Sequence, residues 1–158
     1  MPNGESLRNR YEELKLTQHF TLEELTLSQT AERHGLSNAP NDEALANLME
    51  LALLLEDVRY MVRVPVFVSS GYRSPEVNKR VGGAKNSAHL YGRAADIIAP
   101  PFTPYDLAER IAVSTLDFDK VILEFGRWVH IQISNNPRRL VLSAIHNGAE
   151  TEYVTGLT

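Results

Sequence analysis

Three side chains of this sequence are of the types that make a plausible catalytic zinc site. His89, Asp96 and His130 supply two imidazoles and one carboxylate, and a catalytic zinc ion commonly takes three such ligands and leaves a fourth position to water. The chain contains no cysteine, so a zinc site has to be built from histidine and carboxylate groups. His89 and Asp96 are seven residues apart, which suits a loop histidine that folds back over a strand aspartate, with Gly92 permitting the reversal.

The pattern around His130 places this histidine on the polar face of a strand. Apolar and polar residues alternate from Trp128 to Ser134, so one face of the expected strand is apolar and the other is polar. His130 lies on the polar face, where a histidine by itself is usually solvated, so its assignment as a ligand depends on the rest of the site. Asp117 and Asp119 precede the neighbouring strand and are expected to be loop carboxylates.

The elements expected around these residues describe one α+β domain with a helical N-terminal part. Apolar residues recur at three- and four-residue steps from Asp42 to about Met61, which predicts a long helix. Thr21 followed by Glu24 is typical of a capping box and predicts a short helix before it. Strands are expected at 65–68, 94–98, 120–125, 128–134 and 139–144, and helical segments near 75–80 and after Thr103. Helices followed by a small, mainly antiparallel sheet flanked by helices indicate an α+β fold.

Length and composition limit the class of protein. The 158 residues fit a single domain spanning 1–158, with 1–16 and 145–158 as candidates for flexible ends. The net charge is −4 and no basic tract is present, which argues against nucleic-acid binding. No apolar stretch approaches the roughly 20 residues of a membrane helix, and the N-terminus lacks the apolar segment of a secretory signal. We expect a monomer that binds neither nucleic acid nor membrane.

Motifs on both sides of His89 are similar to those of a known enzyme family. They are Ser70-Gly71-Tyr72-Arg73-Ser74, Gly82-Gly83, and Ser87-x-His89-x-x-Gly92-x-Ala94-x-Asp96, followed by Trp128-x-His130. Together they resemble the zinc D-alanyl-D-alanine carboxypeptidase and L-alanyl-D-glutamate endopeptidase family, peptidoglycan metallopeptidases that include phage endolysins. The segment Phe20–Leu25 resembles a phage-associated branch of that family, and the likeness spans residues 17–134.

The resemblance implies a zinc metallopeptidase that hydrolyses an amide bond in the peptide part of bacterial peptidoglycan. It implies one zinc ion per chain, bound by His89, Asp96 and His130. Whether the enzyme is a carboxypeptidase or an endolysin-like endopeptidase stays open, because these activities share the zinc ligands and differ in the loops around the cleft.

Three residues are assigned to the substrate site. The resemblance implies that Arg73 faces the substrate carbonyl, where a guanidinium can stabilise the oxyanion of a tetrahedral intermediate. The alternative for Arg73 is a loop arginine that bonds backbone carbonyls. Ser87 either bonds a neighbouring backbone group or binds substrate. Trp128 is a candidate for the lining of the site, although a half-buried core position near the hairpin is the commoner role.

One position departs from the family pattern. The family usually has a catalytic carboxylate or histidine three residues before the last ligand, where this chain has Arg127, which cannot act as a base. The nearest carboxylate is Glu124, six residues before His130. A two-residue turn would pair Glu124 with Val129 and face it to the core, whereas an odd-numbered loop would place it directly opposite His130, with Cβ atoms about 5 Å apart. We expect the second arrangement, with Glu124 as the general base, because an unpaired buried carboxylate is costly.

Two other functions fit the same residues. The chain could be a catalytically weak module of a phage particle that binds zinc and peptidoglycan, or a zinc-free fold that keeps the motif as scaffold. Metal analysis separates the last possibility from the others, and substitution of Glu124 separates an enzyme from a binding module. The missing secretory signal favours a phage or prophage protein made in the cytoplasm that acts on the cell wall after lysis or from a virion.

Overall fold

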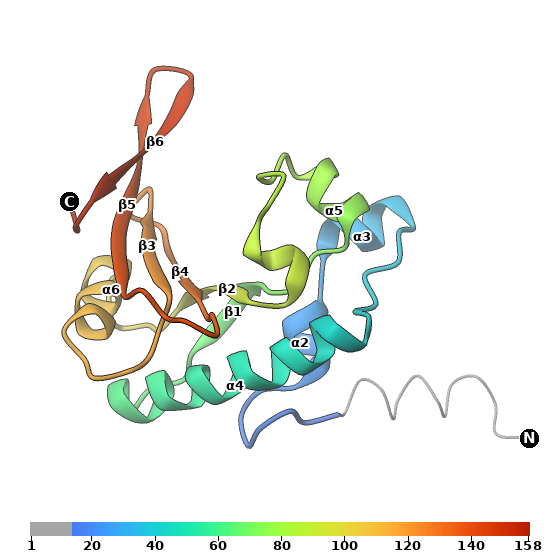
Figure 1. Ribbon diagram of the computed structural model, residues 1–158, viewed down its shortest axis with the longest axis horizontal. Helices are drawn as coiled ribbons and strands as arrows, with labels where there is room; N and C mark the ends of the chain where they lie inside the picture. Colours follow the sequence, from blue (N-terminus) through green and yellow to red (C-terminus); the bar gives the residue numbers. More distant parts are fainter. Residues whose placement is uncertain (1–13) are drawn as a thin grey trace, which may run out of the picture.

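The computed structural model describes residues 14–158, and within them six strands form one sheet beside a set of helices (Figure 1). Of the residues 1–16 that were expected as a flexible end, 1–13 lie outside the described part, and Lys15 pairs with Thr21 in an isolated β-bridge. None of the helices in residues 14–158 has the length and apolar character needed to cross a membrane.

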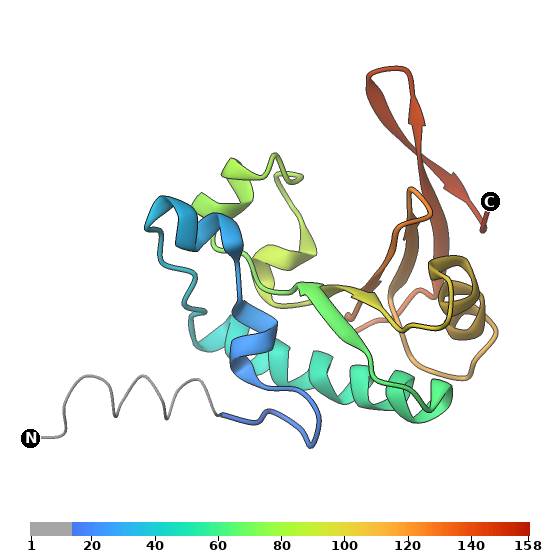
Figure 2. The ribbon, with the colours of Figure 1, turned by 180° about the vertical axis from the view of Figure 1, so that it is seen from behind.

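The N-terminal part is helical, as predicted. Helix α2 (Leu22–Thr26) is capped by Thr21, whose Oγ1 accepts a hydrogen bond from the backbone N of Glu24 at 3.1 Å. Helix α3 (Gln29–His34) follows. The long helix α4 spans Asp42–Val62, close to its predicted bounds, and Figures 1 and 2 show it running beneath both the sheet and the loop segments. Most of the apolar stripe of α4 is buried, as its periodicity requires, although Met49 is exposed.

The sheet has the order β1-β2-β4-β3-β5-β6. Only the β3–β5 pair is parallel and the other neighbours are antiparallel, which confirms a mainly antiparallel sheet in an α+β fold. Its strands are β1 (Phe67–Ser70), β2 (Ala94–Ile98), β3 (Lys120–Glu124), β4 (Trp128–Gln132), β5 (Leu140–Asn147) and β6 (Glu150–Thr155). The shorter elements between them are α5 (Pro75–Arg80), the 3₁₀ turn η1 (Ala88–Tyr91) and α6 (Pro104–Ala112).

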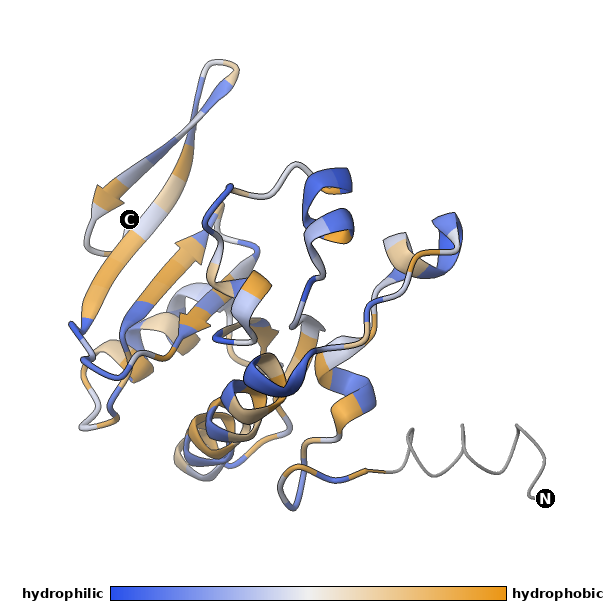
Figure 3. Cartoon of the chain, turned by 45° about the vertical axis from the view of Figure 1, so that its right-hand side comes forward, coloured by the Kyte–Doolittle hydropathy of each residue, from blue (hydrophilic) through white to orange (hydrophobic). Residues whose placement is uncertain are grey.

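One face of the sheet packs against helices and the other carries the polar residues of interest. Ile97, Val129 and Ile131 belong to a core that also includes Leu48 of α4 and Leu107 of α6. Because side chains alternate along a strand, the neighbours of these residues point to the opposite face, as predicted from the pattern around His130. Figure 3 shows hydrophobic residues along the central strands, whereas β6 is mainly hydrophilic.

The hairpin between β3 and β4 differs from the expected one in its pairing. Its loop has the expected odd length, residues 125–127, but Glu124 pairs with Trp128, and Ile122 is the residue opposite His130. The prediction that Glu124 lies directly opposite His130 is therefore wrong by two residues along the ladder, although Glu124 still shares the face of His130. The strand ends before Phe125 because that residue turns into the left-handed region, with a φ of 54°.

The C-terminal part is more ordered than the sequence indicated. The strand expected at 139–144 continues to Asn147, and residues 150–155 pair with it as β6. Most of the segment 145–158, a candidate for a flexible end, thus belongs to a β-hairpin that projects beside the central strands (Figure 1).

Candidate metal centre and cleft

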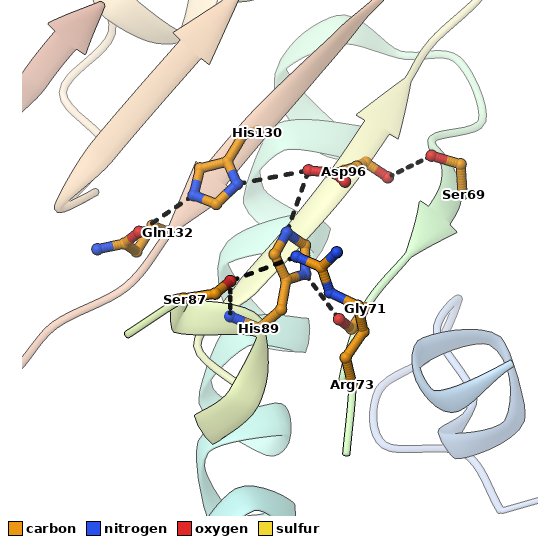
Figure 4. A network of polar contacts seen from close by, with 8 residues as sticks. All are labelled: Ser69, Gly71, Arg73, Ser87, His89, Asp96, His130 and Gln132. Carbon is orange, nitrogen blue, oxygen red and sulfur yellow. Dashed lines mark hydrogen bonds and ion pairs between the residues drawn. The ribbon is translucent and has the colours of Figure 1, made fainter. Parts of the chain in front are cut away.

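The sheet register brings two of the three predicted ligands together. Asp96 on β2 and His130 on β4 are direct partners in the antiparallel ladder, so their side chains stand next to each other on the same face. His89 reaches the same point from η1 (Figure 4). Asp96 Oδ1 lies 3.3 Å from His89 Nε2 and 3.4 Å from His130 Nδ1, and one ligand atom from each of the three residues lies within 4.8 Å of the others.

The turn that carries His89 is fixed at both of its ends. Ser87 caps it by accepting a hydrogen bond from the backbone N of His89 at 3.3 Å. Gly92 ends it in the left-handed conformation with a φ of 71°, which favours glycine. Gly92 also lies against α4, where an added Cβ would come within 2.5 Å of the carbonyl oxygen of Ala44. The expected reversal at Gly92 is therefore present, and it holds the buried His89 over the sheet.

The hydrogen bond that each imidazole makes on the side away from Asp96 determines which of its two nitrogens carries the proton. His89 Nδ1 lies 2.7 Å from the carbonyl oxygen of Gly71, which can only accept, so Nδ1 carries the proton and Nε2 presents a lone pair. His130 Nε2 lies 3.0 Å from Oε1 of Gln132, so Nε2 donates and Nδ1 presents the lone pair. Such outer contacts are typical of histidines that bind metals.

The contacts of Asp96 fit a zinc ion in spacing, and the three groups together fit it in charge. Two ligands of a tetrahedral zinc ion stand about 3.3–3.5 Å apart, given zinc–ligand bonds of about 2.0–2.2 Å, and the two measured separations from Asp96 are 3.3 and 3.4 Å. Asp96 Oδ1 is buried and has no hydrogen-bond partner within residues 14–158. Burial by itself would raise the pKa of Asp96, but the contacts with His130 and His89 outweigh burial and keep this pKa well below its usual range. An anionic carboxylate and two neutral imidazoles are a suitable donor set for zinc.

The ligand cluster opens into a cleft of about 800 Å³. All seven site residues predicted from the sequence line this cleft: Arg73, Ser87, His89, Asp96, Glu124, Trp128 and His130. Its size is in the range of pockets that hold small ligands or short peptides. The structure therefore brings the predicted residues together, and their roles in catalysis and binding stay predictions.

Arg73 is held at the edge of the cleft by Ser87. Its Nη2 donates to Ser87 Oγ at 3.3 Å, and its backbone N donates to the carbonyl oxygen of His89 at 3.0 Å. Its Nε is buried and has no partner in the described part of the chain. Burial lowers the pKa of Arg73, and the negative charges of Asp96 and Glu124 oppose this effect. The guanidinium thus bonds a hydroxyl at the site and keeps a donor group free.

Glu124 and Trp128 face the cleft as a cross-strand pair. Burial raises the pKa of Glu124, and the charge of Asp96 adds to the increase, while His130 and Arg73 oppose it. The indole Nε1 of Trp128 is buried and lacks a partner among residues 14–158. The half-buried position expected for Trp128 and its place in the lining are therefore both present.

Two features of the site were missed from the sequence. Asp119, expected to be a loop carboxylate, is 2% exposed, forms an ion pair with Arg138 at 2.8 Å and accepts a hydrogen bond from Gln132. The alternation along β4 had placed Gln132 beside His130, which was a signal for its role, but no local pattern connects Asp119 to Arg138. The β5–β6 hairpin also contributes to the cleft, through Leu142, Thr151 and Tyr153.

Comparisons with known proteins point to one family. A sequence model described as peptidase M15 matches residues 18–132, which is well over half of the chain and includes all seven predicted site residues. The zinc D-Ala-D-Ala carboxypeptidase of Streptomyces albus G is 38% identical to this chain over 80 residues. That alignment covers 50% of this chain and 31% of the Streptomyces protein, so the chain spans less than a third of that relative's length.

Proposed function

We propose, because the chain belongs to the peptidase M15 family, that it hydrolyses an amide bond in the peptide part of bacterial peptidoglycan with one zinc ion. The observation that carries the proposal is the convergence of His89, Asp96 and His130 in a cleft that also contains Arg73 and Glu124. The name of the Streptomyces relative supports zinc as the metal and a cell-wall peptide as the substrate.

Glu124 is the general base of this proposal. His89, Asp96 and His130 would hold the zinc ion, which supplies a Lewis acid for the amide carbonyl and lowers the pKa of a water molecule to about 7. Glu124 removes a proton from the attacking water and then delivers it to the leaving amine. Its raised pKa suits a general base, because a carboxylate with a pKa nearer to neutral takes up a proton more readily than an ordinary carboxylate.

Arg73 and Ser87 act together on the developing negative charge. A guanidinium stays protonated at neutral pH, so Arg73 can donate from its free groups to the oxyanion of the tetrahedral intermediate. Ser87 holds one end of the guanidinium through its hydrogen bond, which limits the orientations of Arg73. Trp128 then forms part of the wall that the substrate contacts.

Three finer points belong to the same proposal: the bond that is cleaved, the origin of the protein and its oligomeric state. Either a carboxypeptidase or an endolysin-like endopeptidase fits the ligand set, and product analysis separates them: release of the terminal D-alanine indicates the first, and cleavage within the stem peptide indicates the second. A phage or prophage origin, with action after lysis or from a virion, rests on the likeness of Phe20–Leu25 to the phage-associated branch. The monomeric state is likewise a prediction.

The test combines metal content with cleavage of purified peptidoglycan peptides. We expect one zinc ion per wild-type chain and its loss in His130→Ala. Glu124→Gln should keep the zinc ion and lose a factor of about 10²–10⁴ in kcat, which is the range for removal of a general base. The matched control is Glu150→Gln, because Glu150 is an exposed carboxylate of β6 outside the cleft lining. If the wild type binds zinc and cleaves no peptide, the result would contradict the proposed peptidase activity and favour a binding module.

A further inference from the structure

We propose that Gln132 and Asp119 are positioning residues that determine which nitrogen of His130 is free to bind the metal. The inference rests on the metal site of the proposed function but not on the reaction that the site carries out. It concerns a chain of side chains that begins on the surface at Arg138 and ends at His130 (part of it in Figure 4).

The two histidines of the site are oriented by different kinds of partner. His89 donates to the backbone carbonyl of Gly71, and a carbonyl can only accept. His130 instead faces the side-chain amide of Gln132. An amide presents either an oxygen that accepts or an NH₂ group that donates, so Gln132 by itself would leave the tautomer of His130 undetermined.

Asp119 determines which end of the amide faces His130. The Nε2 group of Gln132 donates to Asp119 Oδ2 at 2.8 Å. An ionised carboxylate only accepts, so the NH₂ end of the amide has to point to Asp119. The oxygen end must then point to His130, where it accepts the proton of Nε2.

Asp119 is in turn held in place as an anion. Arg138 donates to it from Nε at 2.9 Å and from Nη2 at 2.8 Å, and the backbone N of Arg138 adds a third bond at 3.2 Å. The side-chain contact with Arg138 lowers the pKa of Asp119 to about 2. Asp119 is also fixed at its backbone, because its N donates to the carbonyl oxygen of Gln132 at 2.8 Å.

The chain of contacts opposes the effect of Asp96. His130 Nδ1 lies 3.4 Å from Asp96 Oδ1, and that carboxylate favours a proton on Nδ1, which would block the nitrogen that faces the metal position. With Gln132 reversed, Nε2 of His130 would have to accept a hydrogen bond, and the proton would move to Nδ1. Gln132 and Asp119 therefore keep the lone pair of His130 on the side of His89 and Asp96.

Four variants test this assignment. Gln132→Met removes the acceptor at similar length, and Asp119→Asn allows the amide of Gln132 to reverse. Gln132→Glu places a second carboxylate against Asp119, and Gln132→Glu combined with Asp119→Asn restores one donor and one acceptor between these positions. The control is Lys120→Met, because Lys120 is the backbone ladder partner of Gln132 and lines the same cleft, but within residues 14–158 its side chain forms no hydrogen bond or ion pair with Gln132 or Asp119.

Two readouts are independent of peptidase activity. Zinc affinity is measured by competition with a chelator, and we expect Gln132→Met to weaken it about 10–100-fold, as is typical when the outer partner of a metal-binding histidine is lost. Asp119→Asn should weaken zinc binding in the wild-type background and strengthen it in the Gln132→Glu background, because the two positions act as one unit. Lys120→Met should bind zinc like the wild type.

The second readout is ¹⁵N NMR of the imidazoles of His89 and His130 in the metal-free protein at alkaline pH. Gln132→Met should move the proton of His130 toward Nδ1 and leave His89 unchanged, because the partner of His89 is a backbone carbonyl. An unchanged tautomer of His130 together with an unchanged zinc affinity in Gln132→Met would overturn the proposal. Zinc binding that responds as expected in a protein without peptidase activity would uphold it and contradict only the proposed function.

Discussion

Asp119 makes a contribution to folding that should depend on pH. The contact with Arg138 lowers its pKa from 3.8 to about 2 in the folded protein, so ionised Asp119 favours the folded state by about 2 kcal/mol. A lowered pKa stabilises the protein above the unfolded-state pKa, and this stabilisation is lost as the pH falls through the folded-state value. We expect Asp119→Asn to reduce the free energy of unfolding by about 2 kcal/mol near neutral pH, measured by urea denaturation.

The control for this prediction is the neighbouring carboxylate Asp117, which is exposed. Asp117→Asn should change the free energy of unfolding by less than about 0.5 kcal/mol, as is usual for exposed positions. The difference between Asp119→Asn and the wild type should shrink as the pH falls from about 4 to about 2, the two pKa values of Asp119. A difference that stays constant over this pH range would attribute the effect to packing instead of charge.

At the scale of single residues, the sequence identified the members of the site better than their partners. His89, Asp96 and His130 could be selected because metal chemistry restricts ligand types and the motif fixes their spacing. Asp119 could not, because its burial depends on Arg138, nineteen residues further along the chain, and on a strand pairing that no local pattern specifies. Glu124 lies on the predicted face of its strand, the face of His130, but it pairs with a different residue of β4. The cost of burying an unpaired carboxylate determines the strand face and does not determine the cross-strand partner.

The elements that hold the site depend on close packing between the η1 turn and helix α4. Gly92 ends η1 with a φ of 71°, and a Cβ at this position would lie 2.5 Å from the carbonyl oxygen of Ala44 and 3.0 Å from Cγ of Leu48. The backbone of α4 cannot move away at low cost, so Gly92→Ala should displace η1 and with it His89. We expect zinc affinity to fall at least about tenfold, since the ligand geometry is lost.

Gly35 provides a matched control for this prediction. It ends α3 in the same conformation, with a φ of 62°, and no atom lies within 4 Å of its added Cβ. Gly35→Ala should therefore cost only the left-handed strain of about 1–2 kcal/mol and leave zinc binding unchanged. Equal losses of zinc affinity in the two variants would show that strain alone, and not contact with α4, explains the effect of Gly92→Ala.

Elements with a clear period were predicted closely, and the hairpin loops were not. The apolar stripe placed α4 within a residue of its observed end, because burial of one helix face fixes both period and length. The strand before Phe125 was extended one residue too far, since an aromatic residue favours a strand and its left-handed φ of 54° depends on the loop that it enters. Strand β6 was not assigned because Glu150 and Glu152 share one face with Val154, and Thr151 and Thr155 share the other with Tyr153, so neither face is consistently apolar.

At the scale of the whole molecule, the cleft is lined both by residues within the family match and by residues that follow it in the chain. The family match ends at Gln132, the last residue of β4, and contains all the candidate ligands. The β5–β6 hairpin lies beyond it and joins the sheet through the parallel pairing of β3 with β5. Residues of this hairpin line the cleft, so the wall of the cleft depends on chain outside the matched region.

A bound metal ion would add a direct connection between the two parts of the chain that carry its ligands. His89 belongs to the η1 turn above α4, whereas Asp96 and His130 belong to the sheet, and the chain has no cysteine to cross-link these parts. A ligand that binds only the folded state stabilises it by about 2.7 kcal/mol when its free concentration is 100 times its dissociation constant. For a domain of this size, that corresponds to a rise in Tm of about 5–11 °C.

We therefore expect a metal chelator to lower the Tm of the zinc-loaded protein by several degrees and added zinc to restore it, measured by scanning calorimetry. His130→Ala should unfold at the same temperature with and without chelator, because two remaining ligands hold zinc too weakly to shift the equilibrium. Gln132→Met should respond less than the wild type at a fixed zinc concentration, because stabilisation by a ligand grows with the logarithm of its concentration divided by its dissociation constant. A wild-type Tm that does not respond to chelator or zinc would mean that the three side chains converge without binding the metal.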